Sequence, residues 1–293
     1  PDLKWETTTD INLGVDLGLF ENRIRFVADL YKKNTKDLLQ IIYFPGFTEP
    51  YYYNAGEIDN KGLELGLNTR NFTGDFKWNS SFNISFNDNK VVKLGLLKKL
   101  PFQNLTSVGE SVILLTEGSA LGSFYGYKVD KVDPTTGILL YKDINGDGKI
   151  DASDRYRYKK PTADYTFGLF STLNYKKFDF TMNWRASLGN YIFDNVNSNM
   201  GYSDAGLRRQ TDLSNVSSDY LNTGFTFEDN GTQRYLSDYY VKDASFIKLD
   251  NATIGYKMNV KAGSGVRSLR FYLSAQNPFI ITGYTGIDPE VRF

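Results

Sequence analysis

The sequence predicts an all-β protein that is part of a large antiparallel transmembrane β-barrel, and three observations predict it. Polar and apolar residues alternate with a period of two in about eight segments. The longest of these have about a dozen residues, and a tilted strand needs about 9 to 11 residues to cross a bilayer's hydrocarbon core. Tight turns join the segments into pairs, and connections of about 20 to 75 residues join the pairs. Short periplasmic turns opposite long extracellular loops are typical of outer-membrane barrels.

The composition restricts the chemistry that is available. The 293 residues include no Cys and no His, which excludes a thiol nucleophile, a Ser-His-Asp triad and the usual zinc sites. The formal net charge is +0, so the basic stripe of a nucleic-acid-binding surface is not expected. No apolar run approaches 18 residues, which excludes a transmembrane helix, and the first residues carry no signal peptide. We therefore expect this chain to begin inside a longer one.

The clearest hairpin covers residues 163–189. Tyr165, Phe167 and Leu169 share one face of its first strand with Ser171, and Lys176-Lys177 forms the turn. In the second strand the apolar residues from Phe178 to Leu188 alternate with polar or charged ones. This length and alternation predict a long antiparallel ribbon with one apolar face.

Two pairs are predicted before this hairpin. The first has strands at Trp5–Leu19 and Ile24–Leu30, joined by a turn at 20–22. A Tyr-rich connection, Asn34–Gly56, leads to the second pair, with strands around 63–67 and 76–86 and a turn at 73–75.

One further pair is predicted after it, around 247–258 and 269–275, with a loop at 259–265. Its apolar positions change from odd to even numbers near Asp250, which predicts a β-bulge there. Residues 287–293 contain Pro289, which cannot donate to a sheet ladder, so a closing strand is not expected in this chain.

The alternation also predicts which face meets lipid. Because a charge in hydrocarbon is costly, we expect the apolar faces to point outward and the charged residues to point inward, toward a plug or the lumen. The inward residues are Asp10, Asp16, Arg23, Arg25, Glu64, Asp179, Arg185 and Arg270.

Two long extracellular loops, 89–162 and 190–241, are candidates for binding a surface partner. Tyrosines that we expect in loops are candidates for stacking on a sugar or peptide substrate: Tyr51, Tyr52, Tyr53, Tyr239, Tyr240 and Tyr284. An aromatic belt at the membrane interface, or packing within the loops, explains them equally well.

One segment of the first loop fits the D-x-[DN]-x-[DN]-G start of a calcium site. The ligands would come from Asp143, Asn145, Asp147, Lys149 through its carbonyl, Asp151 through water, and Asp154. No helical periodicity flanks the segment, so it is not an EF-hand, and a simple Asx-Gly turn fits as well as a calcium loop.

Other classes of function remain open on the pattern alone. A soluble β-sandwich also alternates, and a calcium-dependent all-β surface binding module is the second hypothesis. An enzyme that uses paired carboxylates, Asp238 with Asp243 or Glu57 with Glu64, is the third. Because carboxylates in loops mostly cap turns, we expect no enzymatic activity.

An ordered set of motifs runs through nearly the whole chain: PDLKWE at 1–6, NAGEIDNKGLE at 54–64, FNISFN at 82–87, FYGY at 124–127, DINGDG at 143–148, QNPF at 276–279 and IDPE at 287–290. With these motifs the chain resembles the C-terminal barrel region of the SusC/RagA family of TonB-dependent outer-membrane transporters. Pro278 and Lys248 depart from the family's expected Leu and Arg.

The resemblance implies a 22-stranded barrel in the outer membrane of a Gram-negative cell, filled by an N-terminal plug and driven through TonB. It also implies a SusD-like surface lipoprotein as a lid, and import of oligomeric glycans or peptides. By the same resemblance, the plug, the TonB-interacting segment, the early strands and the last strand are absent from residues 1–293.

Overall fold

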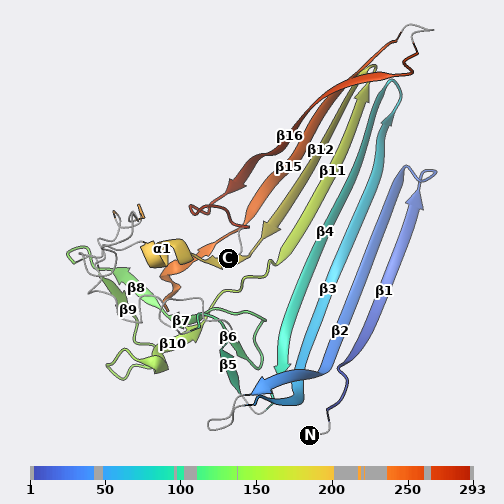
Figure 1. Cartoon of the computed structure of the whole chain (residues 1–293). Coiled ribbons are helices and arrows are strands. Elements are labelled where there is room, and N and C mark those ends of the chain that lie inside the picture. Colours follow the sequence, from blue (N-terminus) through green and yellow to red (C-terminus); the bar gives the residue numbers. More distant parts are fainter. Residues whose placement is uncertain are drawn as a thin grey trace.

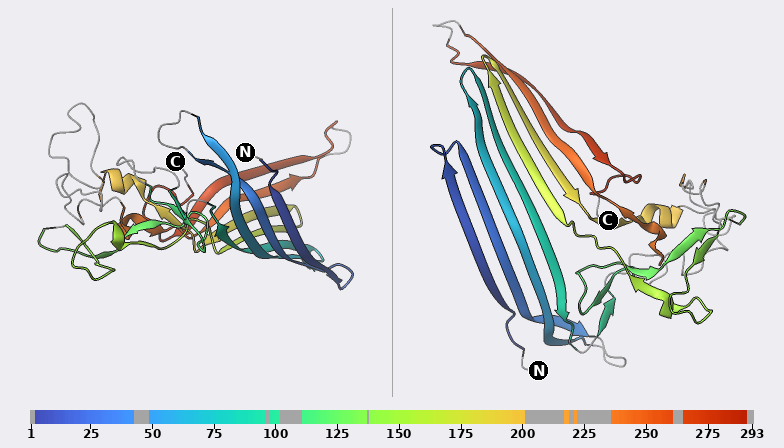
Figure 2. Two further views of the ribbon diagram at one scale, coloured as in Figure 1. Left: turned by 90° about the horizontal axis from the view of Figure 1, so that it is seen from below. Right: turned by 180° about the vertical axis from the view of Figure 1, so that it is seen from behind.

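The computed structural model describes residues 3–42, 49–95, 98–101, 111–136, 138–200, 217–218, 221, 236–260 and 265–290. Eight long strands form one antiparallel sheet in the order β1-β2-β3-β4-β11-β12-β15-β16 (Figure 1). Their bounds are β1 Thr7–Leu19, β2 Ile24–Ile42, β3 Tyr51–Thr73, β4 Phe76–Lys93, β11 Tyr165–Tyr175, β12 Phe178–Leu188, β15 Phe246–Met258 and β16 Leu269–Thr282. The prediction of four hairpins in one antiparallel wall is confirmed. The eight strands form one curved sheet, whereas a β-sandwich would pack two sheets face to face (Figure 2).

The predicted turns lie together at one end of the sheet. Phe20, Glu21 and Asn22 have φ values of 55° to 60°, and Lys176 has φ of 53°, so the chain reverses through left-handed backbone at both places. All long connections leave from the opposite end (Figure 1). The predicted bulge is present, because the register between β15 and β16 shifts between Leu249 and Asn251.

Four strands are longer than the sequence pattern indicated, and one of them is β16, which continues from the predicted end at residue 275 to Thr282. β2 continues to Ile42 and β3 begins at Tyr51, so most of the connection predicted over residues 34–56 is paired strand. The register shifts between Thr35 and Leu39, and pairing then continues to the end of this extension. β4 likewise continues to Lys93, beyond the predicted loop start at residue 89. The alternation that marks a strand inside a membrane is lost here, yet backbone pairing continues.

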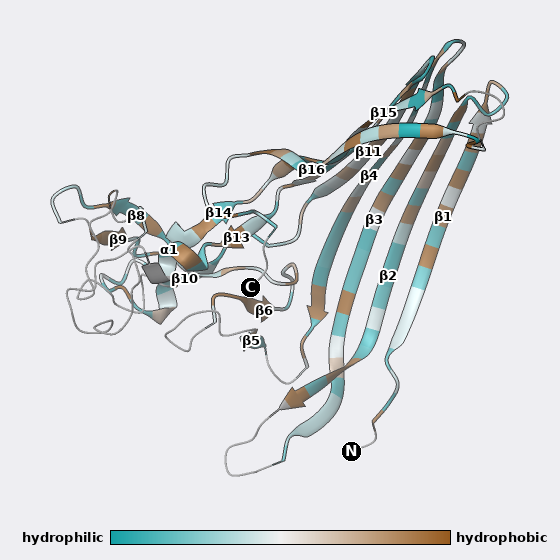
Figure 3. Cartoon of the chain, turned by 45° about the horizontal axis from the view of Figure 1, so that its top comes forward, coloured by the Kyte–Doolittle hydropathy of each residue, from teal (hydrophilic) through white to brown (hydrophobic). Residues whose placement is uncertain are grey.

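Residues that are directly paired share a face of the sheet, so the register separates two faces across all strands. One row crosses all eight strands and is apolar throughout: Leu17, Phe26, Leu67, Phe82, Leu169, Trp184, Leu249 and Phe279. We call the face that carries this row the apolar face and the opposite one the polar face. Figure 3 shows hydrophobic and hydrophilic residues alternating along the long strands, as residues of the two faces succeed one another.

The two long connections fold into small elements beside the open end of the sheet. These are β5 Lys99–Pro101, β6 Leu114–Thr116, β7 Tyr125–Tyr127, β8 Val129–Val132, β9 Leu139–Tyr141, η1 Ala152–Asp154, β10 Arg155–Arg157, β13 Tyr191–Phe193, α1 Asn195–Met200, η2 Asp238–Tyr240 and β14 Val241–Asp243. A shared core joins them: Val112, Ile113, Phe124, Tyr127, Phe193, Leu236 and Tyr240 are buried together. We call this the loop unit. In the described part of the chain, neither length nor apolar character equips any helix to cross a membrane.

Candidate functional site

The apolar face has the dimensions of a membrane-facing surface. At the turn end, one row of paired aromatic side chains crosses five strands: Phe76, Tyr175, Phe178, Tyr256 and Phe271. Ten residues along β11 from Tyr175, Tyr165 lies on the apolar face at the other end, paired with Phe86. Ten residues of strand tilted by 35–45° span about 24–28 Å, close to the roughly 25 Å apolar band of outer-membrane barrels. The aromatic row therefore fits one membrane interface.

The polar face carries every charge that was predicted to point inward. Asp10 pairs in register with Lys33, and their side chains are 3.5 Å apart. The Arg25 guanidinium is 3.2 Å from the Asp16 carboxylate, and Arg270 Nε donates a 3.0 Å hydrogen bond to Asp179. The chain therefore keeps one face of the wall polar and charged, as a wall around an aqueous or plug-filled lumen requires.

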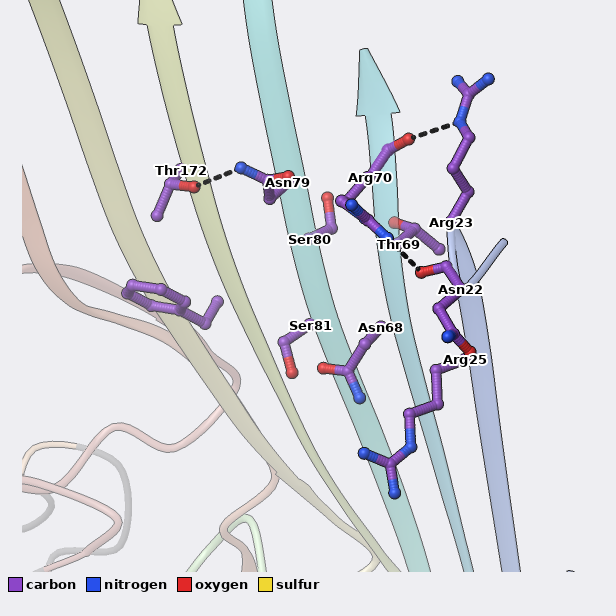
Figure 4. Close-up of a pocket in the computed structure, with 11 residues that line it drawn as sticks. Asn22, Arg23, Arg25, Asn68, Thr69, Arg70, Asn79, Ser80, Ser81 and Thr172 are labelled. Atoms are coloured by element: carbon purple, nitrogen blue, oxygen red, sulfur yellow. Dashed lines mark hydrogen bonds between the residues drawn. The ribbon is translucent and has the colours of Figure 1, made fainter. Parts of the chain in front are cut away.

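A hollow of about 710 Å³ lies on the polar face near the turn end (Figure 4). It is lined by Asn22, Arg23, Arg25, Asn68, Thr69, Arg70, Asn79, Ser80, Ser81, Phe170 and Thr172. Arg70 donates to the backbone carbonyls of Glu21 and Asn22, both at 3.1 Å, so its charge is fixed beside the first turn. No local sequence pattern predicted this cluster, because the register of β2 and β3 brings its guanidinium groups together. Phe170 was not assigned to this face from the sequence.

A second cluster lies on the polar face near the loop end. Arg185 of β12 hydrogen-bonds Asp250 through Nε at 2.9 Å and contacts Glu290 with both terminal nitrogens, one of them at 2.9 Å. Lys248 Nζ donates a 2.7 Å bond to the same Glu290. This cluster ties the segment that follows β16 to the wall. Alternation placed Arg185 on this face, but it gave no sign of Glu290 as its partner.

Hydrogen bonds join the two long connections within the loop unit. Asp238 accepts the Tyr156 hydroxyl at 2.7 Å and the Val129 backbone N–H at 2.9 Å. Tyr127 N–H donates to the Leu236 carbonyl at 2.7 Å. Burial, together with the hydrogen bond to Asp238, raises the pKa of Tyr156, so this hydroxyl stays protonated and donating. The loop unit is thus one packed body built from both connections.

The candidate tyrosines do not form one group. Tyr51, Tyr52 and Tyr53 lie in β3, which corrects the expectation that they occupy a loop, because the β2–β3 ribbon continues past the membrane-sized band. Tyr51 and Tyr52 are 41% and 40% exposed and remain accessible to a solute, whereas the Tyr53 hydroxyl donates to Gln40 at 2.8 Å.

The other three tyrosines belong to the loop end. Tyr240 is 0% exposed inside the loop unit, so its ring packs and cannot contact a solute in this structure. Tyr239 packs edge-on against Tyr240, with ring centroids 5.0 Å apart, and Lys242 Nζ lies over the Tyr239 ring, 4.5 Å from its centroid. Burial raises the pKa of Tyr284 to about 12.

In the acidic segment 143–154 the candidate ligands bond to the segment's own backbone. Asp143 accepts the N–H groups of Gly146 at 2.6 Å and Gly148 at 2.7 Å. Asp154 is 0% exposed and accepts from Ile144, Asn145 and Asp151.

The remaining side-chain candidates in this segment behave in the same way. Asn145 accepts from the backbone of Asp147, Asp147 from that of Lys149, and Asp151 from that of Ser153. Among the residues that the structure describes, no group of three or more acidic side chains is gathered to hold a metal ion. Calcium binding here stays a prediction.

The carboxylates considered for an enzyme either lie on opposite faces or bond to other groups. Glu57 and Glu64 lie an odd number of residues apart in β3 and therefore on opposite faces. Asp238 is bonded to Tyr156 and Val129, and Asp243 accepts the Ser245 N–H at 2.8 Å.

Comparisons with known proteins agree with this geometry. A family model described as "TonB dependent receptor-like, beta-barrel" matches residues 1–278. The TonB-dependent receptor SusC of Bacteroides thetaiotaomicron is 36% identical over 99% of this chain and 30% of its own length. TonB-dependent receptor P3 of Formosa agariphila is 32% identical over 100% of this chain and 31% of its own length. A structure of the RagAB peptide transporter superposes with a TM-score of 0.82 at 25% identity, and covers 99% of this chain and 33% of that one. The chain spans about a third of these relatives.

Proposed function

The chain belongs to the TonB-dependent receptor β-barrel family, and from this we propose that the whole protein imports oligomeric nutrients, glycans or peptides, across the outer membrane with energy supplied through TonB. This segment lies in the outer membrane as part of the barrel wall. The family is one of transporters and receptors rather than a class of enzymes. The observation that carries the proposal is the division of one sheet into a membrane-sized apolar face and a charged, hollowed polar face.

Binding and gated passage are the mechanism that this arrangement supports. A charged wall cannot face lipid, so it faces a plug or a solute, and oligomers with many hydroxyl or amide groups suit its Asn, Ser, Thr and Arg side chains. The hollow near the first turn supplies such groups from β2, β3, β4 and β11.

We propose a SusD-like surface lipoprotein as the partner at the loop end. The relatives SusC and RagAB motivate this partner, and the packed loop unit offers it a preformed surface. Tyr51 and Tyr52 keep exposed rings, but neighbours in a strand point to opposite faces, so only one of them can face the lumen. We propose Tyr52 as the substrate contact.

Uptake by cells that express the full-length protein tests the function. We expect accumulation of a labelled oligosaccharide or peptide library that is lost when TonB or the proton gradient is removed. Accumulation that is independent of both would contradict energy coupling.

Association with the lid has its own test. Deleting residues 197–218, most of which lie outside the described residues, should weaken co-purification of the lipoprotein and leave membrane insertion intact. Unchanged co-purification would remove this loop from the proposed interface.

The calcium prediction is tested separately. Titrating Ca²⁺ into the full-length protein should change the protection of residues 143–154 against hydrogen exchange at about 10⁻⁴ to 10⁻³ M if the loop holds the ion. If the protection of these residues is the same with Ca²⁺ and with a chelator, the segment is a turn held by its own hydrogen bonds and not a calcium site.

A further inference from the structure

The apolar face changes character abruptly on β2, β3 and β4 at the loop end. Two residues beyond the row that contains Leu30, Leu63 and Phe86, the outward positions become charged. Five lysines share this face: Lys32, Lys36, Lys61, Lys90 and Lys93. We call them the outer lysine cluster.

Register and contacts place these lysines together on the outside of the wall. Lys32 is directly paired with Lys61, two residues from the apolar Leu30 and Leu63 pair. Lys61 Nζ lies 3.3 Å from Asp88. In contrast, Lys33 follows Lys32 in β2 but contacts Asp10, which lies on the polar face. These two neighbouring lysines of β2 therefore lie on opposite faces of the sheet.

Three acids share the outer surface with the cluster, and each already has partners. Glu57 lies 3.8 Å from Lys36 and also accepts from Asn34 at 2.8 Å. Asp59 accepts from the same Asn34 amide at 2.6 Å, and Asp88 pairs with Lys61.

Five lysines thus face three acids, which leaves an excess of positive charge. Within the described residues, Lys32, Lys90 and Lys93 are exposed and enter no ion pair. Lys32 stands directly opposite another lysine, an arrangement that is repulsive unless an anion lies between the two.

The height of the cluster above the hydrocarbon band indicates which kind of anion it would meet. Two residues of tilted strand rise about 5 Å along the membrane normal, so the lysines begin just outside the hydrocarbon band. Lipid phosphates lie at this level, and a basic cluster gains roughly 1 kcal/mol per Lys or Arg from an anionic membrane surface. The cluster is continuous with the apolar face below it, so a lipid whose chains lie on Leu30, Leu63 and Phe86 presents its headgroup there.

We propose that the outer lysine cluster binds the phosphate headgroups of anionic lipids in the outer leaflet, with Lys32, Lys61 and Lys90 as the principal donors. The same height on β1 carries only Thr9 and Ile11 on this face, so the binding surface is confined to β2, β3 and β4. This inference concerns the outside of the wall and does not depend on what passes through the lumen.

The test measures binding of phosphatidylglycerol to the full-length protein in neutral detergent, by native mass spectrometry or by the lipid-dependent rise in melting temperature. The variant Lys32→Gln with Lys90→Gln removes two of the three cluster lysines that enter no ion pair. We expect about a fivefold loss of apparent affinity for each lysine, or about 25-fold for both. The matched control, Lys33→Gln with Lys77→Gln, changes the same two strands on the polar face and should keep the affinity.

Three outcomes would overturn the proposal. An equal loss in the control variant would mean that only net charge matters. Equal binding of phosphatidylcholine and phosphatidylglycerol would remove the requirement for an anionic headgroup. A change in oligomeric state in Lys32→Gln with Lys90→Gln, without a change in lipid affinity, would assign the surface to a second copy of the protein. Free inorganic phosphate at millimolar concentration should not compete, because it lacks the acyl chains that the apolar face holds.

Discussion

Trp78 of β4 and Ser171 of β11 are joined across two neighbouring strands by a 2.8 Å hydrogen bond from the indole Nε1 to the serine hydroxyl. Both side chains lie on the apolar face, where Ser171 is only 1% exposed. Hydrocarbon offers no partner for a polar group, so this bond satisfies the indole N–H within the wall. The hydrogen bond explains why a serine occupies this position among the apolar residues of β11.

Removing the Ser171 hydroxyl tests that reason. We expect Ser171→Ala to lower the free energy of unfolding by about 1–3 kcal/mol, because the indole N–H loses its acceptor. Denaturant unfolding of the full-length protein in lipid vesicles measures the change. Ser81→Ala, on the polar face with water available, should fall within about 0.5 kcal/mol of the parent. Equal effects would contradict the assignment of the two faces.

Leu169 and Phe170 are neighbours in β11 on opposite faces, which gives a direct test of which face meets lipid. Leu169→Lys should cost about 2–4 kcal/mol, since Leu169 lies near the middle of the apolar band. Phe170→Lys should leave membrane insertion intact, because its side chain projects into the hollow. The amount of folded protein in outer-membrane fractions measures the effect of each substitution. Reversed effects would place lipid on the polar face.

The contact of Arg185 with Asp250 should give a measurable coupling energy. The side chains are 45% and 22% exposed, so solvent weakens the pair and we expect about 0.5–1 kcal/mol in a double-mutant cycle of Arg185→Gln and Asp250→Asn. The coupling should shrink in high salt. Glu290→Gln should in addition increase hydrogen exchange of residues 284–290, because it breaks the contact of that segment with the wall. Unchanged exchange would mean that other contacts hold the segment.

Acid should loosen the segment 143–154 through Asp154. The backbone N–H of Asp151, with those of Ile144 and Asn145, holds the pKa of Asp154 below its usual value. The carboxylate therefore stabilises the fold above the unfolded pKa of about 3.9, and this stabilisation is lost as the pH falls through the lower folded pKa. Hydrogen exchange of this segment, corrected for intrinsic rates, should show protection that is constant from pH 7 to 5 and falls below about pH 4. Asp154→Asn should be less protected already at pH 7, and a pH-independent parent would contradict the prediction.

Two tyrosines that look alike in the sequence should behave differently. Tyr240→Ala removes a fully buried ring and should destabilise the loop unit by about 3–5 kcal/mol, seen as faster proteolysis of residues 190–245. Tyr52 is 40% exposed near the start of β3, so Tyr52→Ala should leave stability within about 0.5 kcal/mol and lower substrate uptake. Normal uptake by Tyr52→Ala would exclude this ring from substrate binding.

The sequence predicted the parts of the wall that lipid constrains. Alternation identified all four hairpins and the bulge at Asp250, because a lipid-facing position tolerates few residue types. It ended β2 too early at Leu30, since Lys32 and Lys36 interrupt the apolar pattern. Those lysines end the apolar pattern but not the strand, because backbone pairing does not depend on what the side chains contact.

The rest depended on contacts between distant segments. Glu290 reaches Arg185 across 105 positions of sequence, and Tyr127 joins Leu236 inside the loop unit; no local pattern encodes either contact. The acidic segment shows a different limit. Its motif predicted oxygens converging on a point, yet the same short side chains bond equally well to their own backbone.

Curvature gives the glycines of the polar face a geometric role. The inner surface of a curved wall has less area per residue than the outer surface, so side chains that point inward compete for room. At Gly168 a Cβ would stand 2.7 Å from the Asn83 amide oxygen, and at Gly255 it would stand 2.4 Å from an Arg270 nitrogen. The space that a side chain would fill at each glycine is therefore occupied by a longer side chain from the next strand. A methyl group at either position would have to displace these polar side chains, so Gly168→Ala would move Asn83, and Gly255→Ala would move Arg270 and its partner Asp179, on the surface that faces the lumen.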